Sequence, residues 1–254
     1  MADEAADAPV GKARGNAPAG AAPERRAERE QDRSRDRERD ASGPDEPVLV
    51  DKTWVYHTCW TGAWLYTKLY HRLRVEGYEN IPKEGGAVLA SNHQSHLDIL
   101  TIASSNRRHV AFVARDTLAH WKWLAFTMRG CGAILIQRNS SDRKALRAMA
   151  QHLERGDLVV IFPEGTRTQD GALGEFKGGA LLAARMAKVP IVPVGTRGAI
   201  EAWPRSRPIP FPKQIAVRFG APIDSAAPDA QARLVVAVQS MIGDGRYGSV
   251  PPTR

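Results

Sequence analysis

Short apolar runs alternate with stretches of helical spacing over most of the chain. Six runs of four to seven residues are typical of buried strands: AVLA (87–90), HVAFVA (109–114), AILIQ (133–137), DLVVIF (157–162), VPIVPVG (189–195) and QIAVRFG (214–220). Helical patterns fall between or after them, at Leu97–Ser105, Thr117–Met128, Lys144–Arg155, Ala180–Lys188 and Ala230–Ile242. Strands that alternate with helices predict a single α/β domain with a central, largely parallel sheet flanked by helices.

An aromatic segment precedes the first of these strands. Residues 52–73 hold three of the six tryptophans and three of the five tyrosines, several of them four residues apart. The part without a charged residue, 53–67, has about fifteen residues, whereas a helix that crosses a membrane needs about twenty. Basic residues follow at Lys68, Arg72 and Arg74. The segment therefore indicates either a helix lying in the headgroup region of a membrane or a helix packed on the domain by its aromatic face.

The first part of the chain differs in composition from the rest. Residues 1–46 are rich in Ala, Pro and charges of both signs, with almost no large apolar side chains and no apolar stretch typical of a secretory signal. Such a segment cannot bury enough surface to offset the entropy of ordering. We therefore expect a disordered tail over 1–46, an amphipathic helical segment at the membrane interface over 47–74, a folded domain over 75–245 and a flexible C-terminus over 246–254.

Charge is distributed unevenly along the chain. The net charge is +8, but residues 1–50 hold 9 Lys and Arg against 12 Asp and Glu, and the remainder holds 27 against 16. A basic domain favours anionic partners such as phosphorylated metabolites or anionic lipids. Arginines and aromatics are not interleaved as on a base-stacking surface, so we expect no nucleic-acid partner. Two cysteines, Cys59 and Cys131, lack metal-binding spacing and indicate either thiols in a reducing compartment or one disulfide.

A histidine and an aspartate open the helical pattern that follows AVLA. In SNHQSHLDIL, His93 lies in the turn after the predicted strand and Asp98 lies near the first turn of the next helix. A carboxylate that binds one imidazole nitrogen fixes the tautomer and leaves the other nitrogen free to accept a proton. A structural interpretation fits the same residues, because Ser95 and Asp98 have the spacing of a helix capping box and Asn92 is itself a good cap.

Basic residues mark three further loop junctions. Arg167 lies in FPEGTR after the strand DLVVIF, Arg138 ends GAILIQR, and Lys177 precedes a predicted helix whose N-terminus itself attracts anions. A guanidinium near a glycine can present its N–H groups to a phosphate while the backbone comes close. A single residue of this kind is more often a solvent-facing charge than a ligand contact, but three at junctions of one sheet predict an anion site.

Together these blocks resemble the glycerolipid acyltransferase family, the PlsC-type 1-acylglycerol-3-phosphate acyltransferases. NHQSHLD corresponds to the family's His-x4-Asp block, GAILIQR to its second, FPEGTR to its third and VPIVPVG to its fourth, in the family's order over about residues 75–195. The resemblance implies that His93 is the general base, that Asp98 orients it, and that Arg138 and Arg167 bind the acceptor's phosphate. Further residues that it assigns to the acceptor site are Glu164, Gly165, Thr166 and Lys177.

The resemblance implies an O-acyltransferase. Its donor would be an acyl thioester, either acyl-CoA or acyl carrier protein, and its acceptor a hydroxyl of lysophosphatidic acid or a related glycerophospholipid, giving phosphatidic acid. His93 would remove the hydroxyl proton during direct attack on the thioester, with no metal and no cofactor beyond the co-substrate. We expect the protein to be cytoplasmic and peripherally bound to the inner face of the cell membrane, on anionic lipids.

Three other functions are compatible with the residues alone. Gln137 in the second block and His96 in the first depart from the family pattern, which leaves a different lipid acceptor open. A hydrolase or transacylase could use the same histidine, although no GxSxG elbow occurs. A non-catalytic module could bind anionic lipid through its basic face.

Overall fold

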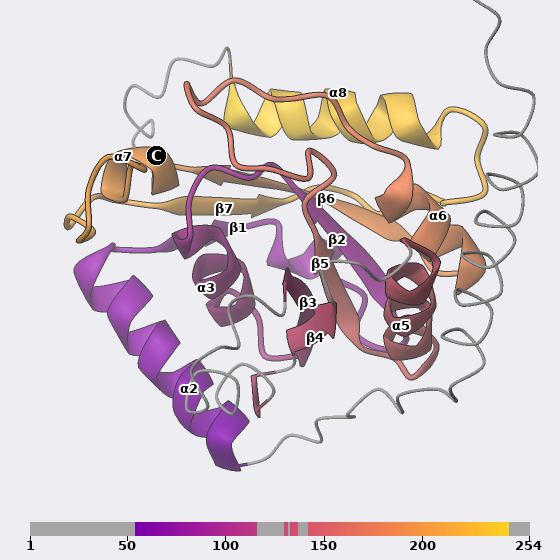
Figure 1. The fold of residues 1–254 in the computed structure, drawn as a ribbon, viewed down its shortest axis with the longest axis horizontal. Coiled ribbons are helices and arrows are strands. Elements are labelled where there is room, and N and C mark those ends of the chain that lie inside the picture. The colour runs from indigo at the N-terminus through magenta and orange to yellow at the C-terminus, as the bar shows by residue number, and fades with distance from the viewer. Residues whose placement is uncertain (1–53, 116–129, 132, 137–141, 244–254) are drawn as a thin grey trace, which may run out of the picture. The chain divides into compact units, whose positions relative to one another are not determined.

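Seven strands form one sheet in the order β1-β7-β6-β2-β5-β3-β4 (Figure 1). The computed structural model describes residues 54–115, 130–131, 133–136 and 142–243. The tail and C-terminus expected over 1–46 and 246–254, the helix expected over 117–128 and Arg138 lie outside these residues. The strands are β1 (Arg74–Glu76), β2 (Ala87–Ser91), β3 (Val110–Arg115), β4 (Ala133–Ile136), β5 (Leu158–Ile161), β6 (Ile191–Arg197) and β7 (Ala216–Phe219).

The sheet is parallel apart from one junction. β2 lies between β5 and β6, and β3 lies between β5 and β4, all in parallel register. β7 runs antiparallel to β6, with Val194 opposite Phe219, and β1 is parallel to β7. A largely parallel sheet flanked by helices confirms the expected fold class. The expected strands correspond to β2 through β7, whereas β1 is too short to give an apolar run.

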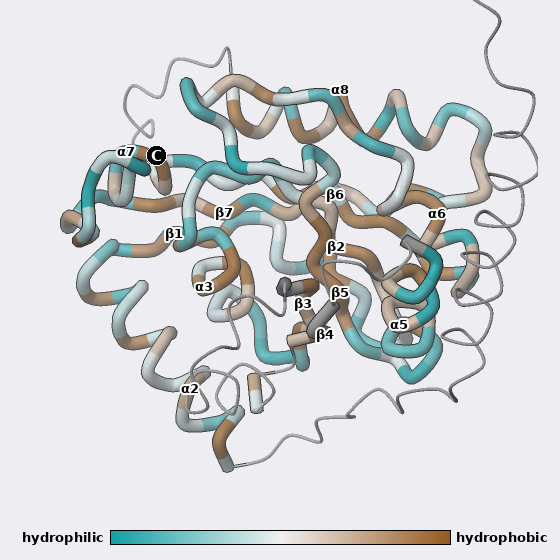
Figure 2. Tube along the Cα trace, in the orientation of Figure 1, coloured by the Kyte–Doolittle hydropathy of each residue, from teal (hydrophilic) through white to brown (hydrophobic). Residues whose placement is uncertain are grey.

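Helices cover both faces of this sheet. They are α2 (Trp54–Leu65), α3 (Leu97–Ser104), α5 (Asp142–Glu154), α6 (Gly179–Met186), α7 (Ala199–Ala202) and α8 (Ala230–Ile242), with a π-helical turn η1 (Tyr66–Tyr70) and a 3₁₀ turn η2 (Tyr78–Asn80). Successive side chains of a strand point to opposite faces. Val88 and Ala90 of β2 thus pack toward α5, α6 and α8, while Ala87 and Leu89 pack toward α3 and α7. Figure 2 shows these strands as the most hydrophobic part of the interior.

The aromatic segment is helical and packs against α3. Trp60 Nε1 donates hydrogen bonds to the carbonyls of Ala103 (3.2 Å) and Asn106 (3.0 Å), just where α3 ends. In the following turn η1, Thr67 Oγ1 lies 3.0 Å from Ser104 Oγ, and this contact is buried. One side of the segment is therefore part of the packed domain.

The remaining sides of α2 carry both apolar and polar side chains. Trp54, Trp64 and Leu65 are exposed, and apolar side chains are spread around the helix instead of forming one stripe. Polar side chains are exposed on α2 as well (His57, Thr58 and Thr61), so the helix is not divided into an apolar and a polar face. None of the described helices combines the length and apolar content needed to span a membrane.

Candidate active site

His93 and Asp98 form a hydrogen-bonded pair beyond the carboxyl end of β2. His93 Nδ1 lies 2.9 Å from Asp98 Oδ2, the contact expected from their spacing. Asp98 lies in the first turn of α3 and is fully buried, whereas 19% of the His93 side chain is exposed. Since Nδ1 binds the carboxylate, Nε2 is the nitrogen that can take a proton from a ligand.

Asp98 also fixes the turn that precedes α3. Its Oδ2 atom accepts hydrogen bonds from the backbone N–H groups of Gln94 (2.6 Å) and Ser95 (2.8 Å). The Ser95 bond is one half of the capping box suggested by the sequence. Ser95 Oγ accepts the N–H of Leu97 (3.3 Å) in place of the Asp98 N–H of a capping box, and it donates to the carbonyl of Trp203 (3.1 Å). One carboxylate therefore both orders this turn and binds the His93 ring, so the structural and chemical interpretations describe a single arrangement.

Asn92 anchors the start of the same loop. Its side-chain oxygen accepts the N–H of Thr196 (2.8 Å), and its amide donates to the Thr196 carbonyl (3.0 Å). These bonds continue the pairing between β2 and β6 past the end of β2. Asn92 is consequently an extension of the sheet and not the helix cap that its residue type allowed.

Glu164 connects the FPEGTR loop to the histidine loop. Its buried carboxylate accepts the N–H of His93 on one oxygen (2.8 Å) and the N–H of Gly174 on the other (3.0 Å). Burial raises the pKa of Glu164, and the two backbone bonds oppose that rise. The ring of Phe162 stacks on the His93 imidazole with 3.9 Å between ring centroids. This geometry gives Glu164 a role in positioning His93, which the sequence pattern alone did not indicate.

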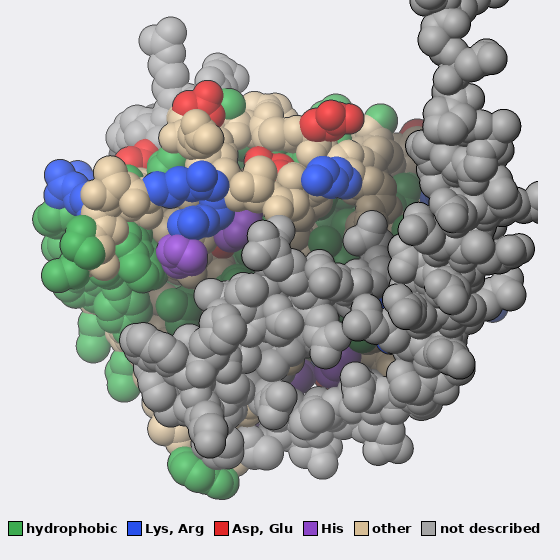
Figure 3. Space-filling view, viewed as in Figure 1, with side chains coloured by type: hydrophobic (Ala, Val, Ile, Leu, Met, Phe, Trp, Pro, Cys, Tyr) green, Lys and Arg blue, Asp and Glu red, His purple; other side chains and the backbone are tan. Residues whose placement is uncertain are grey.

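Basic side chains surround the exposed side of this loop. Gly165 has a φ of +71°, and a Cβ atom there would lie 3.1 Å from Lys177 Nζ, so the lysine side chain lies over the glycine. Burial and the neighbouring Arg205 both lower the pKa of Arg167. Figure 3 shows Lys and Arg side chains beside histidines on this face, next to a hydrophobic area.

The structure brings most of the predicted site residues to one place. They are His93, Asp98, Glu164, Gly165, Thr166, Arg167 and Lys177. Arg138 lies outside the described residues. Trp203 and Arg205, from the segment after α7, contact this site but were not predicted. The basic run in RSRPIPFPK was the available signal, yet nothing in its spacing related it to His93.

A profile of the Acyltransferase family matches residues 72–197, which contain the His93 and FPEGTR loops. The chain belongs to this acyltransferase family. It is 32% identical over 148 residues to a chloroplastic 1-acyl-sn-glycerol-3-phosphate acyltransferase of Arabidopsis thaliana, and 27% identical over 145 residues to a 1-acyl-sn-glycerol-3-phosphate acyltransferase of Bacillus subtilis. Both matches cover 57% of this chain, but they span 41% of the Arabidopsis protein and 72% of the Bacillus protein.

A solved acyltransferase shares the fold of this chain. The crystal structure of the 1-acyl-sn-glycerophosphate acyltransferase PlsC from Thermotoga maritima superimposes with a TM-score of 0.64 at 28% sequence identity. The superposition covers 74% of this chain and 78% of the Thermotoga chain. The sheet and helices described above are thus a PlsC-like acyltransferase domain.

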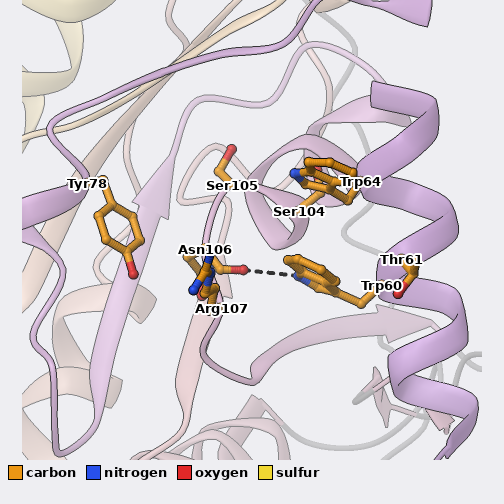
Figure 4. Close-up of a pocket in the computed structure, with 8 residues that line it drawn as sticks. All are labelled: Trp60, Thr61, Trp64, Tyr78, Ser104, Ser105, Asn106 and Arg107. Carbon is orange, nitrogen blue, oxygen red and sulfur yellow. Dashed lines mark hydrogen bonds between the residues drawn. The ribbon is translucent and has the colours of Figure 1, made fainter. Parts of the chain in front are cut away.

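The domain also has a hollow of about 520 Å³ away from the His93 loop. It is lined by Trp60, Trp64, Tyr78 and the residues that follow α3 (Figure 4). The two tryptophan rings are stacked with centroids 6.4 Å apart. The hollow lies at the opposite end of α3 from Asp98, so it is separate from the His93 and Asp98 pair.

Across the part of the chain that is described, no group of three His, Cys, Asp or Glu is arranged to hold a metal ion.

Proposed function

We propose that this acyltransferase moves a fatty acyl group from an acyl thioester to the free hydroxyl of lysophosphatidic acid and so produces phosphatidic acid. The observation that carries the proposal is the 2.9 Å contact between His93 Nδ1 and Asp98 Oδ2, which leaves Nε2 for a hydroxyl beside basic side chains. The names of the Arabidopsis and Bacillus relatives support this donor and acceptor chemistry.

The reaction proceeds by direct transfer. His93 Nε2 accepts the proton of the acceptor hydroxyl while that oxygen attacks the thioester carbonyl. The new C–O bond forms, the C–S bond breaks, and the departing thiolate takes the proton back from the imidazolium. Asp98 holds the imidazole in one tautomer and stabilises the imidazolium that forms. Holding both substrates against His93 removes most of the entropic cost of their encounter.

The other predicted residues recognise the acceptor. Arg167, together with Arg138, neutralises the acceptor's phosphate through charge-assisted hydrogen bonds. Lys177 lies over Gly165 at 3.1 Å from its would-be Cβ, where it adds a third positive charge. Gly165 and Thr166 line the approach to these groups, and Glu164 keeps the loop of His93 in place through its backbone bond.

The protein meets its lipid substrates at a membrane surface. We define the apolar surface as Leu65, Leu69, Tyr70 and Ile209. Leu69 is 74% exposed and Ile209 is 69% exposed, and Tyr70 donates a hydrogen bond to the Pro210 carbonyl, which joins the two segments. Exposed apolar side chains of this kind mark interaction sites. The excess of Lys and Arg over residues 51–254 favours a bilayer that contains anionic lipid, and we place the protein on the inner face of the cell membrane.

Product analysis tests the proposed reaction. The full chain is incubated with lysophosphatidic acid and radiolabelled palmitoyl-CoA, and in parallel with palmitoyl acyl carrier protein. Labelled phosphatidic acid is expected with at least one donor, and only when lysophosphatidic acid is present. Thiol release that does not depend on the acceptor would instead identify a thioesterase. Transfer to other lipids but not to lysophosphatidic acid would identify a different acceptor.

A further inference from the structure

We propose that Arg205 is a further guanidinium ligand of the acceptor's phosphate, beside Arg167. The inference rests on the proposed function, because it assigns a binding residue to the same reaction. Arg205 belongs to the segment between α7 and β7, and it lies outside residues 72–197, the part matched by the family profile.

Two contacts hold the Arg205 segment against the catalytic loops. Arg205 Nη2 donates a hydrogen bond to the carbonyl of Arg167 (2.5 Å), so its guanidinium contacts the FPEGTR loop directly. Two residues earlier, the Trp203 carbonyl accepts the Ser95 hydroxyl (3.1 Å), and the Trp203 ring lies 5.5 Å from the ring of His96. The segment is therefore joined to both loops that carry the proposed catalytic and phosphate-binding groups.

Among the described residues, the positive charges brought together in this way lack a carboxylate partner of their own. Within the described ranges, neither Arg167 nor Arg205 forms an ion pair with a carboxylate. Burial, Arg167, His93 and Arg205 all lower the pKa of His96, and only the nearby Asp98 opposes them. Asp98 is itself buried against His93. Like charges held this close raise the energy of the empty site, and a bound anion removes that cost.

The donor geometry fits a phosphate monoester. A guanidinium has five N–H donors, of which Arg205 uses one on the Arg167 carbonyl, so several remain for a ligand. A phosphate has three terminal oxygens that can accept bonds from two guanidinium groups at once. Because Arg205 is exposed while Arg167 is half-buried, we infer that Arg205 closes the solvent side of the phosphate site.

The test compares Arg205→Ala with Arg207→Ala. Arg207 is the matched control, because it lies two residues away, carries the same charge and places its guanidinium over the Phe211 ring at 4.4 Å. In neutral detergent micelles without anionic lipid, Arg205→Ala should raise KM for lysophosphatidic acid on the order of tenfold to a hundredfold, with a smaller change in kcat. Arg205→Lys should recover only part of the loss. The lysine keeps the positive charge, but its ammonium cannot bind two oxygens in the same plane as a guanidinium does. Equal KM values for Arg205→Ala and Arg207→Ala would overturn the inference.

Two further measurements separate this inference from its alternatives. Inhibition by glycerol 3-phosphate reports the phosphate site directly, and Arg205→Ala should raise its Ki by a similar factor whichever acyl acceptor the enzyme prefers. Failure of wild-type transfer to lysophosphatidic acid would contradict the proposed function, whereas an unchanged Ki would contradict the role of Arg205. If Arg205 instead binds lipid headgroups, Arg205→Ala will weaken retention on phosphatidylglycerol vesicles and leave KM in neutral micelles unchanged. That result would also overturn the role of Arg205 in binding the acceptor's phosphate.

Discussion

At the scale of single residues, Asp98 combines two tasks in one oxygen atom. Asp98 Oδ2 accepts the N–H groups of Gln94 and Ser95 as well as the His93 ring. The two backbone bonds fix the carboxylate independently of the imidazole, so His93 is oriented by an acceptor whose position is already set. Removing the charge while keeping the shape should therefore affect the chemistry more than the fold.

Asp98→Asn is predicted to lower kcat by a factor on the order of 1,000, because an amide can neither fix the productive tautomer nor stabilise the imidazolium. Stability should fall by only about 1 kcal/mol, as expected for a weakened turn. Asp224→Asn is the control, since Asp224 also binds a backbone N–H, that of Ala226 at 2.9 Å, but lies in a different loop. Similar kcat values for the two variants would contradict the role of Asp98.

A second pair with the same spacing shows what the sequence pattern cannot distinguish. His152 and Asp157 are also five residues apart, and His152 Nδ1 lies 2.9 Å from Asp157 Oδ2. This histidine is buried, at 3% exposure, and the aspartate lies at the amino end of β5. Spacing alone predicts the contact in both places. Only the fold separates the pair at the carboxyl end of β2, with an exposed imidazole and basic neighbours, from the structural pair.

The contacts of Asp157 with His109 and His152 are predicted to be sensitive to acid. Burial alone would raise the pKa of Asp157, but His109 and His152 outweigh it and hold the pKa below the ordinary value of 3.8. A carboxyl whose pKa is lower in the folded state stabilises the fold above its unfolded pKa. That contribution is lost as the pH falls below 3.8 through the folded pKa.

Asp157→Asn should lower the free energy of unfolding at pH 7 by about 1 to 3 kcal/mol, because two buried imidazoles lose a charged partner. Below pH 3.8 the difference from the wild type should shrink. Denaturant unfolding between pH 3 and 7 measures both effects. Asp229→Asn, which breaks an exposed ion pair with Arg233, should change stability by less than about 0.5 kcal/mol. A pH-independent difference for Asp157→Asn would contradict the linkage.

At the scale of elements, α2 and η1 pack on the domain on one side, and the membrane interpretation of the aromatic segment stays a prediction. Trp60 and Thr67 pack against α3, while Leu65 and Leu69 remain exposed. Deleting the segment would remove buried contacts as well as the exposed surface. A surface substitution therefore tests membrane binding more sharply than a truncation does.

Leu65→Ser combined with Leu69→Ser should weaken binding to phosphatidylglycerol vesicles by a factor on the order of 100 or more, since full insertion of each leucine contributes about 1.5 to 3 kcal/mol and each step of about 1.4 kcal/mol is a factor of ten. Val236→Ser is the control, because Val236 is 68% exposed on α8 and lies on the other side of the sheet from α2. Equal sedimentation of the two variants with vesicles would indicate that something other than a membrane covers this surface.

Long periodic elements were predictable from the sequence, and short or unusual ones were not. α3, α5, α6 and α8 begin and end within two residues of their expected bounds, because their apolar faces repeat over two or more turns. β1 and α7 have three and four residues, too few to show a period. The antiparallel direction of β7 depends on its pairing with β6, which no local pattern encodes.

At the scale of the whole domain, the sheet order explains why distant motifs meet. β2 lies directly between β5 and β6, so the loops that follow these three strands leave the sheet at neighbouring positions. They supply His93, Arg167 and the segment of Arg205, which are separated by as many as 112 positions in the chain and whose loops are joined by hydrogen bonds at the site. The individual loops could be identified from the sequence, but the proximity of Arg205 required the topology.

The role of His93 is tested most directly by thiol release from palmitoyl-CoA with and without lysophosphatidic acid, for the wild type, His93→Ala and His57→Ala. His57 is an exposed histidine on α2 and controls for the loss of an imidazole. We expect acceptor-dependent release that falls by a factor on the order of 100 to 10,000 in His93→Ala and stays near wild type in His57→Ala, with unchanged circular dichroism. Acceptor-dependent release by His93→Ala at the wild-type rate would contradict the role of His93 as the general base.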